Sequence, residues 1–223
     1  MKQLGECRLY TFIDCAYLQG RRPAELARQL CDGGSDLIQL RAKNLPREEV
    51  HRLAEELMPI TEPAGVGLVI NDYPEIARAV GAPVCHLGQE DFFEAGWTHV
   101  SAVRGESASL RVGLSSHAPA QAERAVAAGA DYIAIGPVFA TGTKPSAQPV
   151  TLDYVRWAST HLRIPWFAIG GITLQNLDQI LEAGARNICV VSAILTAPDV
   201  AEACQRFKER LLSTASVNLY QIK

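Results

Sequence analysis

Short apolar runs alternate with longer amphipathic stretches along this chain, and the alternation repeats eight times. The short runs are rich in Val, Ile and Leu and are bounded by Gly, Asp or Pro, which is typical of strands. Their near-continuous apolarity suits strands that are buried on both faces. We therefore predict strands at residues 8–14, 37–41, 67–71, 84–87, 111–115, 132–135, 166–169 and 188–191.

The amphipathic stretches between these runs carry apolar residues at helical spacing, as Leu26, Ala27 and Leu30 do. Glycine follows four of the stretches, where it is expected at a helix C-cap. We predict helices at 23–32, 46–58, 72–81, 119–128, 151–161, 174–183 and 198–212. The weakly periodic segment 92–110 predicts a loop with a poor helix, and residues 212–223 predict a loose C-terminal tail.

Eight strand–helix units in one chain indicate an α/β fold, a TIM (β/α)8 barrel, built as one domain over residues 1–223. A doubly wound sheet is the alternative. It normally has fewer strands, and the Gly-x-Gly-x-x-Gly turn that would support a dinucleotide site is missing from the sequence. In a barrel, ligands bind at the carboxyl ends of the strands, so those ends are where we look for chemistry.

Composition narrows the class of protein further. The chain has 21 basic and 24 acidic residues, a formal charge of −3, and so lacks the basic surplus of a nucleic-acid-binding protein. Apolar runs all fall short of the roughly 18 residues of a membrane span, so no membrane partner is expected. Six separate cysteines without a Cys-x-x-Cys pair indicate buried, reduced thiols in a cytoplasmic protein. The sequence leaves a homo-oligomer open.

Two cations and an amide follow the second predicted strand. Strand alternation places Gln39, Arg41 and Lys43 on one side. Arginine can grip a phosphate through two parallel hydrogen bonds, and lysine adds a point charge, so this trio suits a phosphate or diphosphate. A solvated strand end is the alternative.

Two carboxylates follow the third and fourth predicted strands, at Asp72 and Asp91. These strand ends are adjacent in a barrel, so the two side chains are expected to face one another near the cations. Mg²⁺ takes one or two protein carboxylates and completes its shell with water and phosphate oxygens, so a magnesium site is predicted. For Asp72 the alternative is a helix N-cap ahead of Pro74.

The remaining strand ends carry hydroxyl groups and glycines. Ser115 follows the fifth strand, and a polar loop at 136–145 follows the sixth, where it could close over an anionic ligand. Gly171 and Ser192 follow the seventh and eighth strands, whose loops commonly bind phosphate in barrels. The sequence therefore predicts two phosphate sites, one of them with a metal.

Four segments at these strand ends resemble the thiamine-phosphate synthase family, and the resemblance covers about residues 8 to 212. They are Gln39-Leu40-Arg41-Ala42-Lys43; Asn71-Asp72 with His86-Leu87-Gly88-Gln89-Glu90-Asp91; Gly136-Pro137-Val138-Phe139-Ala140-Thr141-Gly142-Thr143-Lys144; and Ala168-Ile169-Gly170-Gly171-Ile172 with Val191-Ser192-Ala193-Ile194. That family is a TIM barrel that joins 4-amino-5-hydroxymethyl-2-methylpyrimidine diphosphate to hydroxyethylthiazole phosphate, releasing diphosphate. The resemblance implies a transferase of thiamine biosynthesis whose diphosphate leaves a pyrimidine carbocation that the thiazole nitrogen then attacks.

The resemblance also implies roles for individual residues. Lys43, Lys144 and Arg41 would stabilise the leaving diphosphate, and Asp72 and Asp91 would hold Mg²⁺. The pyrimidine diphosphate would lie against Gln39, Leu40, Arg41, Ala42, Lys43, Asn71, Ser115 and Lys144. The thiazole phosphate would lie against Thr141, Gly142, Thr143, Gly171, Val191 and Ser192.

Two other functions stay open on the same barrel. One is the related thiazole tautomerase, an isomerase for which His117 could shuttle a proton. The other is a barrel that binds phosphorylated small molecules without catalysis, because a fold does not determine a function. Retention of Asp72, Asp91, Lys43 and Lys144 favours the synthase over both.

Overall fold

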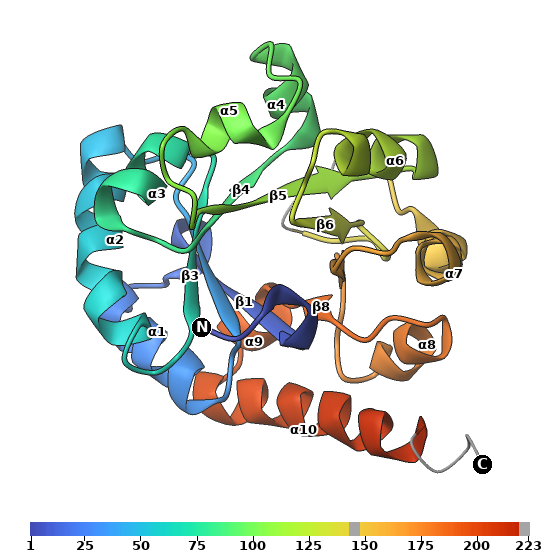
Figure 1. Ribbon diagram of the computed structural model, residues 1–223. Coiled ribbons are helices and arrows are strands. Elements are labelled where there is room, and N and C mark those ends of the chain that lie inside the picture. The colour runs from blue at the N-terminus through green and yellow to red at the C-terminus, as the bar shows by residue number, and fades with distance from the viewer. Residues whose placement is uncertain (143–147, 219–223) are drawn as a thin grey trace.

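Eight parallel strands close into a barrel in chain order, each pairing with the next and the last with the first (Figure 1). The computed structural model describes residues 1–142 and 148–218, and the side chains of these residues as far as 213. The strands are β1 Leu9–Asp14, β2 Leu37–Arg41, β3 Gly67–Asn71, β4 Val84–Leu87, β5 Arg111–Ser116, β6 Tyr132–Ile135, β7 Trp166–Ile169 and β8 Ile188–Cys189. The predicted TIM barrel is confirmed, and the doubly wound alternative is wrong.

Helices form an outer ring around the strands (Figure 1). They are α1 Pro23–Asp32, α2 Arg47–Thr61, α3 Pro74–Val80, α4 Gln89–Glu94, α5 Val100–Arg104, α6 Pro119–Ala127, α7 Thr151–His161, α8 Leu177–Glu182, α9 Ser192–Leu195 and α10 Val200–Asn218. Two short 3-10 helices, η1 Leu4–Glu6 and η2 Cys15–Tyr17, flank β1. The predicted stripe of α1 is buried, and Gly81 ends α3 with a φ of 72°, a left-handed conformation that favours glycine.

Several boundaries differ from those predicted. The segment 92–110 contains the end of α4 and all of α5, whereas α9 was not predicted. Strand β8 ends at Cys189 rather than at residue 191, and α2 continues past Pro59 to Thr61. The predicted tail is wrong as far as residue 218, because α10 continues to Asn218.

Aromatic side chains fill the barrel interior. Tyr10, Tyr132 and Phe167, from β1, β6 and β7, pack edge to face with ring centroids 5.5 to 6.1 Å apart. All three are buried, and they form the floor beneath the carboxyl ends of the strands. The six cysteines are unpaired, four of them buried and two half-buried, as predicted. Among the described residues, no helix is long and apolar enough to cross a bilayer.

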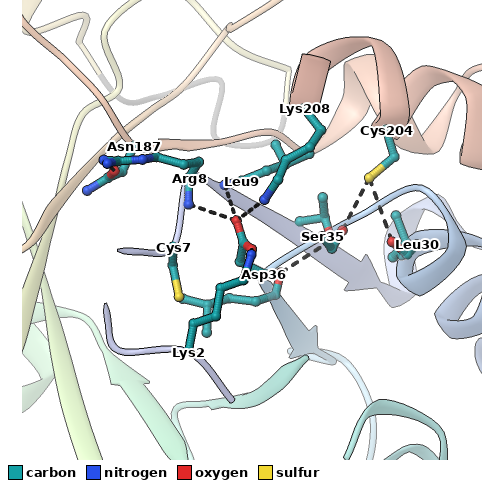
Figure 2. Close-up of polar contacts among 12 residues, drawn as sticks. Lys2, Cys7, Arg8, Leu9, Leu30, Ser35, Asp36, Asn187, Cys204 and Lys208 are labelled. Carbon is teal, nitrogen blue, oxygen red and sulfur yellow. Dashed lines mark hydrogen bonds and ion pairs between the residues drawn. The ribbon is translucent and has the colours of Figure 1, made fainter. Parts of the chain in front are cut away.

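The buried carboxylate of Asp36 joins three parts of the chain where the strands begin (Figure 2). It accepts hydrogen bonds from Lys2 Nζ at 2.7 Å, from the backbone N–H groups of Arg8 at 2.8 Å and Leu9 at 3.0 Å, and from Lys208 Nζ in α10. Burial alone would raise the pKa of Asp36, but the hydrogen bonds from Lys2, Lys208 and the two backbone groups lower it below its ordinary value. These contacts tie the N-terminal segment, β1 and α10 to the start of β2.

We expect Asp36→Asn to lower the free energy of unfolding by about 3–5 kcal/mol, because it leaves the half-buried Lys208 ammonium without its counter-charge and places an amide N–H₂ among donors. Since the folded-state pKa of Asp36 is lowered, its contribution is present above the ordinary carboxyl pKa of about 4 and is lost as pH falls through the folded value. Urea unfolding of both proteins from pH 7 down to pH 3 would measure the effect.

The matched control is Asp153→Asn. In the part of the chain that the structure describes, the Asp153 side chain makes an exposed ion pair with Arg156, so this substitution should change the free energy of unfolding by less than about 1 kcal/mol. Equal losses in the two variants, or a difference between wild type and Asp36→Asn that stays constant with pH, would contradict the role assigned to Asp36.

Candidate active site

A cavity opens at the carboxyl ends of the strands and is lined from every strand of the barrel or the residues that follow it. It encloses about 1040 Å³ of space, part of it open to solvent. A concave site at this end of a barrel suits small-molecule ligands. Eleven of the residues predicted for the site line this cavity: Gln39, Arg41, Lys43, Asn71, Asp72, Asp91, Ser115, Thr141, Gly171, Val191 and Ser192.

Three other predicted residues do not line the cavity. Leu40 is fully buried in the core and Ala42 is also buried; neither lines the cavity, because alternation along β2 turns their side chains away from Gln39 and Arg41. Gly142 is exposed and outside the lining. Thr143 and Lys144 fall outside the described residues. The roles predicted for these five residues stay predictions.

Arg41 is already paired with a buried carboxylate. The β1–β2 register sets Asp14 opposite Arg41, and Arg41 Nη1 lies 2.6 Å from Asp14 Oδ2. The other oxygen of Asp14 accepts the backbone N–H of Ala16. The Asp14 side chain is only 2% exposed and that of Arg41 17%, so the pair is shielded from solvent and orients the guanidinium at the cavity edge.

Asp72 directs its carboxylate towards neighbouring polar groups. It follows β3 with a φ of 67°, which costs a residue other than glycine about 1–3 kcal/mol and is concentrated at functional sites. Asp72 Oδ2 accepts a hydrogen bond from Asn71 Nδ2 at 2.7 Å and lies 3.4 Å from Lys43 Nζ. Tyr73, rather than Asp72, is the N-cap of α3, and no side-chain hydrogen bond caps that helix, so the alternative N-cap role is wrong.

The second carboxylate comes from the first turn of α4. Asp91 folds back towards Gly88, where an added Cβ would lie 2.4 Å from Asp91 Oδ2, so only glycine leaves room for the carboxylate in this position. Ser115, at the end of β5, accepts the backbone N–H of Gln89 at 3.2 Å and so holds the start of α4 against the cavity. Asp72 and Asp91 therefore line one cavity from adjacent strand ends, and their role as Mg²⁺ ligands stays a prediction.

The opposite side of the cavity is formed by backbone-rich segments after β6, β7 and β8. Val138 N–H donates to Ile169 O at 2.8 Å, and Phe139 N–H donates to Gly170 O at 3.1 Å, so the loop after β6 is fastened to the end of β7. A Cβ on Gly171 would lie 2.5 Å from Ala140 O, which requires glycine there. Glycines at positions 170 and 171 leave room for a ligand beside the backbone N–H groups.

Sequence reasoning missed lining residues at the first strand end and in the barrel floor. Asp14, Tyr10 and Phe12 lie in the last three interior positions of β1, and an inspection of that strand end would have found Asp14. His86, in β4, also lines the cavity. His117 lies in the cavity as well, with Nδ1 against Gly136 O.

Comparisons with known proteins agree with one another. Residues 9–194 match the sequence family described as thiamine monophosphate synthase. The chain is 46% identical over 184 residues to a thiamine-phosphate synthase of Thermus thermophilus, covering 82% of this chain and 86% of that protein. It is 42% identical over 214 residues to one of Acidothermus cellulolyticus, covering 95% and 98%. A solved thiamine phosphate pyrophosphorylase of Pyrococcus furiosus superposes with a TM-score of 0.84 at 28% identity, covering 96% of this chain and 99% of that one.

The geometry of Arg41 predicts a loss of stability on its removal. Arg41→Gln should lower the free energy of unfolding by about 3 kcal/mol, because it leaves the buried Asp14 carboxylate without its counter-charge. Lys43→Gln, the matched control in the same cavity, should cost less than about 1 kcal/mol, since Lys43 is 45% exposed and lies 3.4 Å from Asp72. Urea unfolding would measure both.

A double-mutant cycle with Asp14→Asn isolates the pair. The double variant should recover part of the loss seen in Arg41→Gln, because the unpaired buried charge is then gone. Equal losses for Arg41→Gln and Lys43→Gln, or strictly additive effects in the cycle, would show that the pair does not hold the guanidinium.

Proposed function

The chain belongs to the thiamine monophosphate synthase family and is a thiamine-phosphate synthase, and we propose that it forms thiamine phosphate in the barrel mouth by a dissociative, Mg²⁺-assisted reaction. Its substrates are 4-amino-5-hydroxymethyl-2-methylpyrimidine diphosphate and hydroxyethylthiazole phosphate. The C–O bond to the diphosphate breaks with its electron pair on the leaving oxygen. The resulting pyrimidinylmethyl cation is stabilised by the ring amine, and the thiazole nitrogen then donates its lone pair to the methylene carbon.

One observation carries this proposal: a cation and a carboxylate of the same cavity lie side by side, Lys43 Nζ 3.4 Å from Asp72 Oδ2. A diphosphate carries several negative charges, so its site needs cations of its own and a place for a metal ion. Arg41 adds a second cation and Asp91 a second carboxylate to the same lining. A leaving group stabilised in this way needs no protein nucleophile.

The residues present fit Mg²⁺. Carboxylate oxygens are the hard donors that this ion prefers, and two of them leave positions for water and diphosphate oxygens. Within residues 1–142 and 148–218, no cluster of three or more His, Cys, Asp or Glu side chains could hold a metal by itself, which suits an ion that binds together with the substrate. Asp72 and Asp91 would hold it. When bound, Mg²⁺ neutralises charge on the diphosphate and makes it a better leaving group.

The chain's own side chains bind and orient the two substrates. In our proposal Lys43 and Arg41 take up charge that develops on the leaving oxygens, joined by Lys144. Gln39, Asn71 and Ser115 hold the rest of the pyrimidine diphosphate, with the segment at Leu40 and Ala42 behind them.

The thiazole phosphate lies on the other side of the cavity, at Thr141, Gly142, Thr143, Gly171, Val191 and Ser192. In our proposal the backbone N–H groups of these segments hold the phosphate, since backbone N–H groups suit a phosphomonoester. Alignment of the thiazole nitrogen with the methylene carbon is the second contribution to rate. The relatives carry the synthase name, which favours this activity over the tautomerase that His117 left open.

The proposed reaction is tested by thiamine phosphate formation from both substrates, read as thiochrome fluorescence after oxidation. We expect full turnover with Mg²⁺ and a loss of about 100-fold or more after chelation, restored when Mg²⁺ is added back. Undiminished turnover after exhaustive chelation would contradict the metal-assisted mechanism. A folded protein that forms no product under any metal condition would contradict the activity itself.

The proposed metal ligands are tested by Asp72→Asn and Asp91→Asn. Each should lower kcat by about 10²- to 10³-fold and raise the Mg²⁺ concentration needed for half-maximal rate, because each removes a negative ligand. Asparagine keeps the tolerance for positive φ that residue 72 requires, so the melting temperature should change little.

Glu90→Gln is the matched control. Glu90 precedes Asp91 in α4 but is exposed and does not line the cavity, so its rate and metal requirement should equal those of the wild type. If Asp91→Asn behaved like Glu90→Gln, Asp91 would not be a ligand.

A further inference from the structure

Four polar side chains form a hydrogen-bonded chain across the barrel interior, at the floor of the cavity. Gln39 Nε2 donates to the Tyr10 hydroxyl at 2.5 Å, the Tyr10 and Tyr132 hydroxyl oxygens are 3.1 Å apart, and the Tyr132 hydroxyl lies 3.0 Å from His86 Nδ1. The four residues come from β2, β1, β6 and β4. The chain therefore connects four strands of the barrel.

We take the hydrogen bonds along this chain to run in one direction, from Gln39 towards His86. Burial raises the pKa of Tyr10 and of Tyr132 well above the ordinary value, so both hydroxyls keep their protons. The contact between the two hydroxyls admits either one as the donor; because Tyr10 accepts from Gln39, the arrangement that leaves every proton an acceptor has Tyr10 donating to Tyr132. In this arrangement Tyr132 donates to His86 Nδ1, which accepts in the tautomer that carries its proton on Nε2. The carbonyl oxygen of the Gln39 amide is then directed away from Tyr10, and Gln39 lines the cavity.

Tyr132 is placed for this contact rather than for a ligand. It is fully buried and does not line the cavity, whereas Tyr10, Gln39 and His86 do. Gly113, in the middle of β5, makes room for its ring, since a Cβ there would lie 2.1 Å from Tyr132 Cε1 and Cζ. Phe167 packs against both tyrosine rings, at 5.5 Å from each, and holds them in place.

We infer that Tyr132, acting through Tyr10, is a positioning residue that holds the Gln39 amide with its carbonyl oxygen towards the ligand. An oxygen presented there accepts a hydrogen bond from an N–H of the ligand and rejects a group without one. This inference rests on the proposed function, in which the pyrimidine diphosphate with its ring amine lies against Gln39. Tyr132 then determines specificity for an aminopyrimidine without touching it.

Without the Tyr132 hydroxyl, the Tyr10 proton loses its acceptor. Tyr10 can then donate to the Gln39 carbonyl oxygen, which turns the amide N–H₂ towards the ligand. Two donors, the amide and the ring amine, would then face each other. The aminopyrimidine should lose affinity, and a ring with hydrogen in place of the amine should lose little.

The test is Tyr132→Phe, which keeps the ring and its packing. We expect the KM for the pyrimidine diphosphate to rise about tenfold, with the KM for thiazole phosphate and kcat within about twofold of wild type. Calorimetry should show that wild type binds the unreactive aminopyrimidine monophosphate at least tenfold more tightly than its analogue without the amine. The variant should lose that preference.

Two further variants separate positioning from structure. Tyr154→Phe removes another buried hydroxyl, bonded to Ser116 at 2.6 Å and to Ala118 O at 3.0 Å but outside the cavity lining, and should leave both KM values and the preference unchanged. Tyr10→Phe interrupts the same chain one link nearer to Gln39, so it should abolish the preference too. The double variant Tyr10→Phe/Tyr132→Phe should be no worse than Tyr10→Phe alone. Tyr10→Phe also carries the test if Tyr132→Phe does not fold.

The outcomes are distinguishable. A Tyr132→Phe enzyme that keeps the wild-type preference for the amine, or loses affinity equally for both analogues, overturns the inference. A wild type that forms no thiamine phosphate overturns the proposed function instead, whatever the variants do.

Discussion

Closure of the barrel is the constraint on which the rest of the structure depends. Parallel strands satisfy all their backbone hydrogen bonds only when the sheet has no edge, and here the two pairings of β8 are the smallest. Strand β8 has two residues, and it meets β1 through Leu9 with Ile188 and Tyr10 with Cys189. Backbone hydrogen bonds from Ile188 N–H to Arg8 O at 3.0 Å and from Val190 N–H to Tyr10 O at 2.9 Å complete this seam. Asp36 supports it from below, because it accepts the N–H groups of Arg8 and Leu9 just where β1 begins.

Closure also determines which side chains meet. Alternation sends every second residue of a strand to the interior, and the closed ring brings those residues to a common axis. Tyr10 therefore meets Tyr132 although 122 positions separate them, and Asp14 meets Arg41 across 27. The interior has two levels: an aromatic floor with one hydrogen-bonded chain through it, and above it the charged groups of the cavity. A shift of one residue in the β1–β2 register would turn Leu40 into the barrel interior and turn Gln39 and Arg41 out of it. Both the hydrogen-bonded chain of the floor and the charged groups of the cavity would then be lost.

The sequence contains enough to predict the strands and most of the cavity, for a clear physical reason. Strands buried on both faces are continuous apolar runs, and five of the eight have the bounds that the runs predict. Residues at strand ends are polar, so Arg41, Asp72 and Asp91 stand out against the apolar background. Helix α9 does not, because four residues are too few to show a period. Strand β8 is shorter than predicted, and Val191 lies outside the extended region, at φ −112° and ψ −90°. Valine normally favours strands, so its presence in the sequence does not indicate this conformation. The tyrosine chain is hidden for a different reason: a hydroxyl group's partner is set by tertiary contact alone.

Aspartate side chains have opposite roles at the two ends of the barrel. The number of hydrogen-bond donors around each carboxylate explains the difference. Asp36 is 2% exposed and accepts four hydrogen bonds, so its charge is satisfied within the protein and adds stability. Asp72 is 27% exposed, has one amide donor and a lysine at 3.4 Å, and keeps a backbone conformation that costs energy. A carboxylate in that state retains capacity for a further ligand, and the strain needed to direct it towards the cavity is offset elsewhere, by contacts such as those of Asp36. Asp36 thus stabilises the end where the strands begin, whereas Asp72, at the end where they finish, stays available for binding and chemistry.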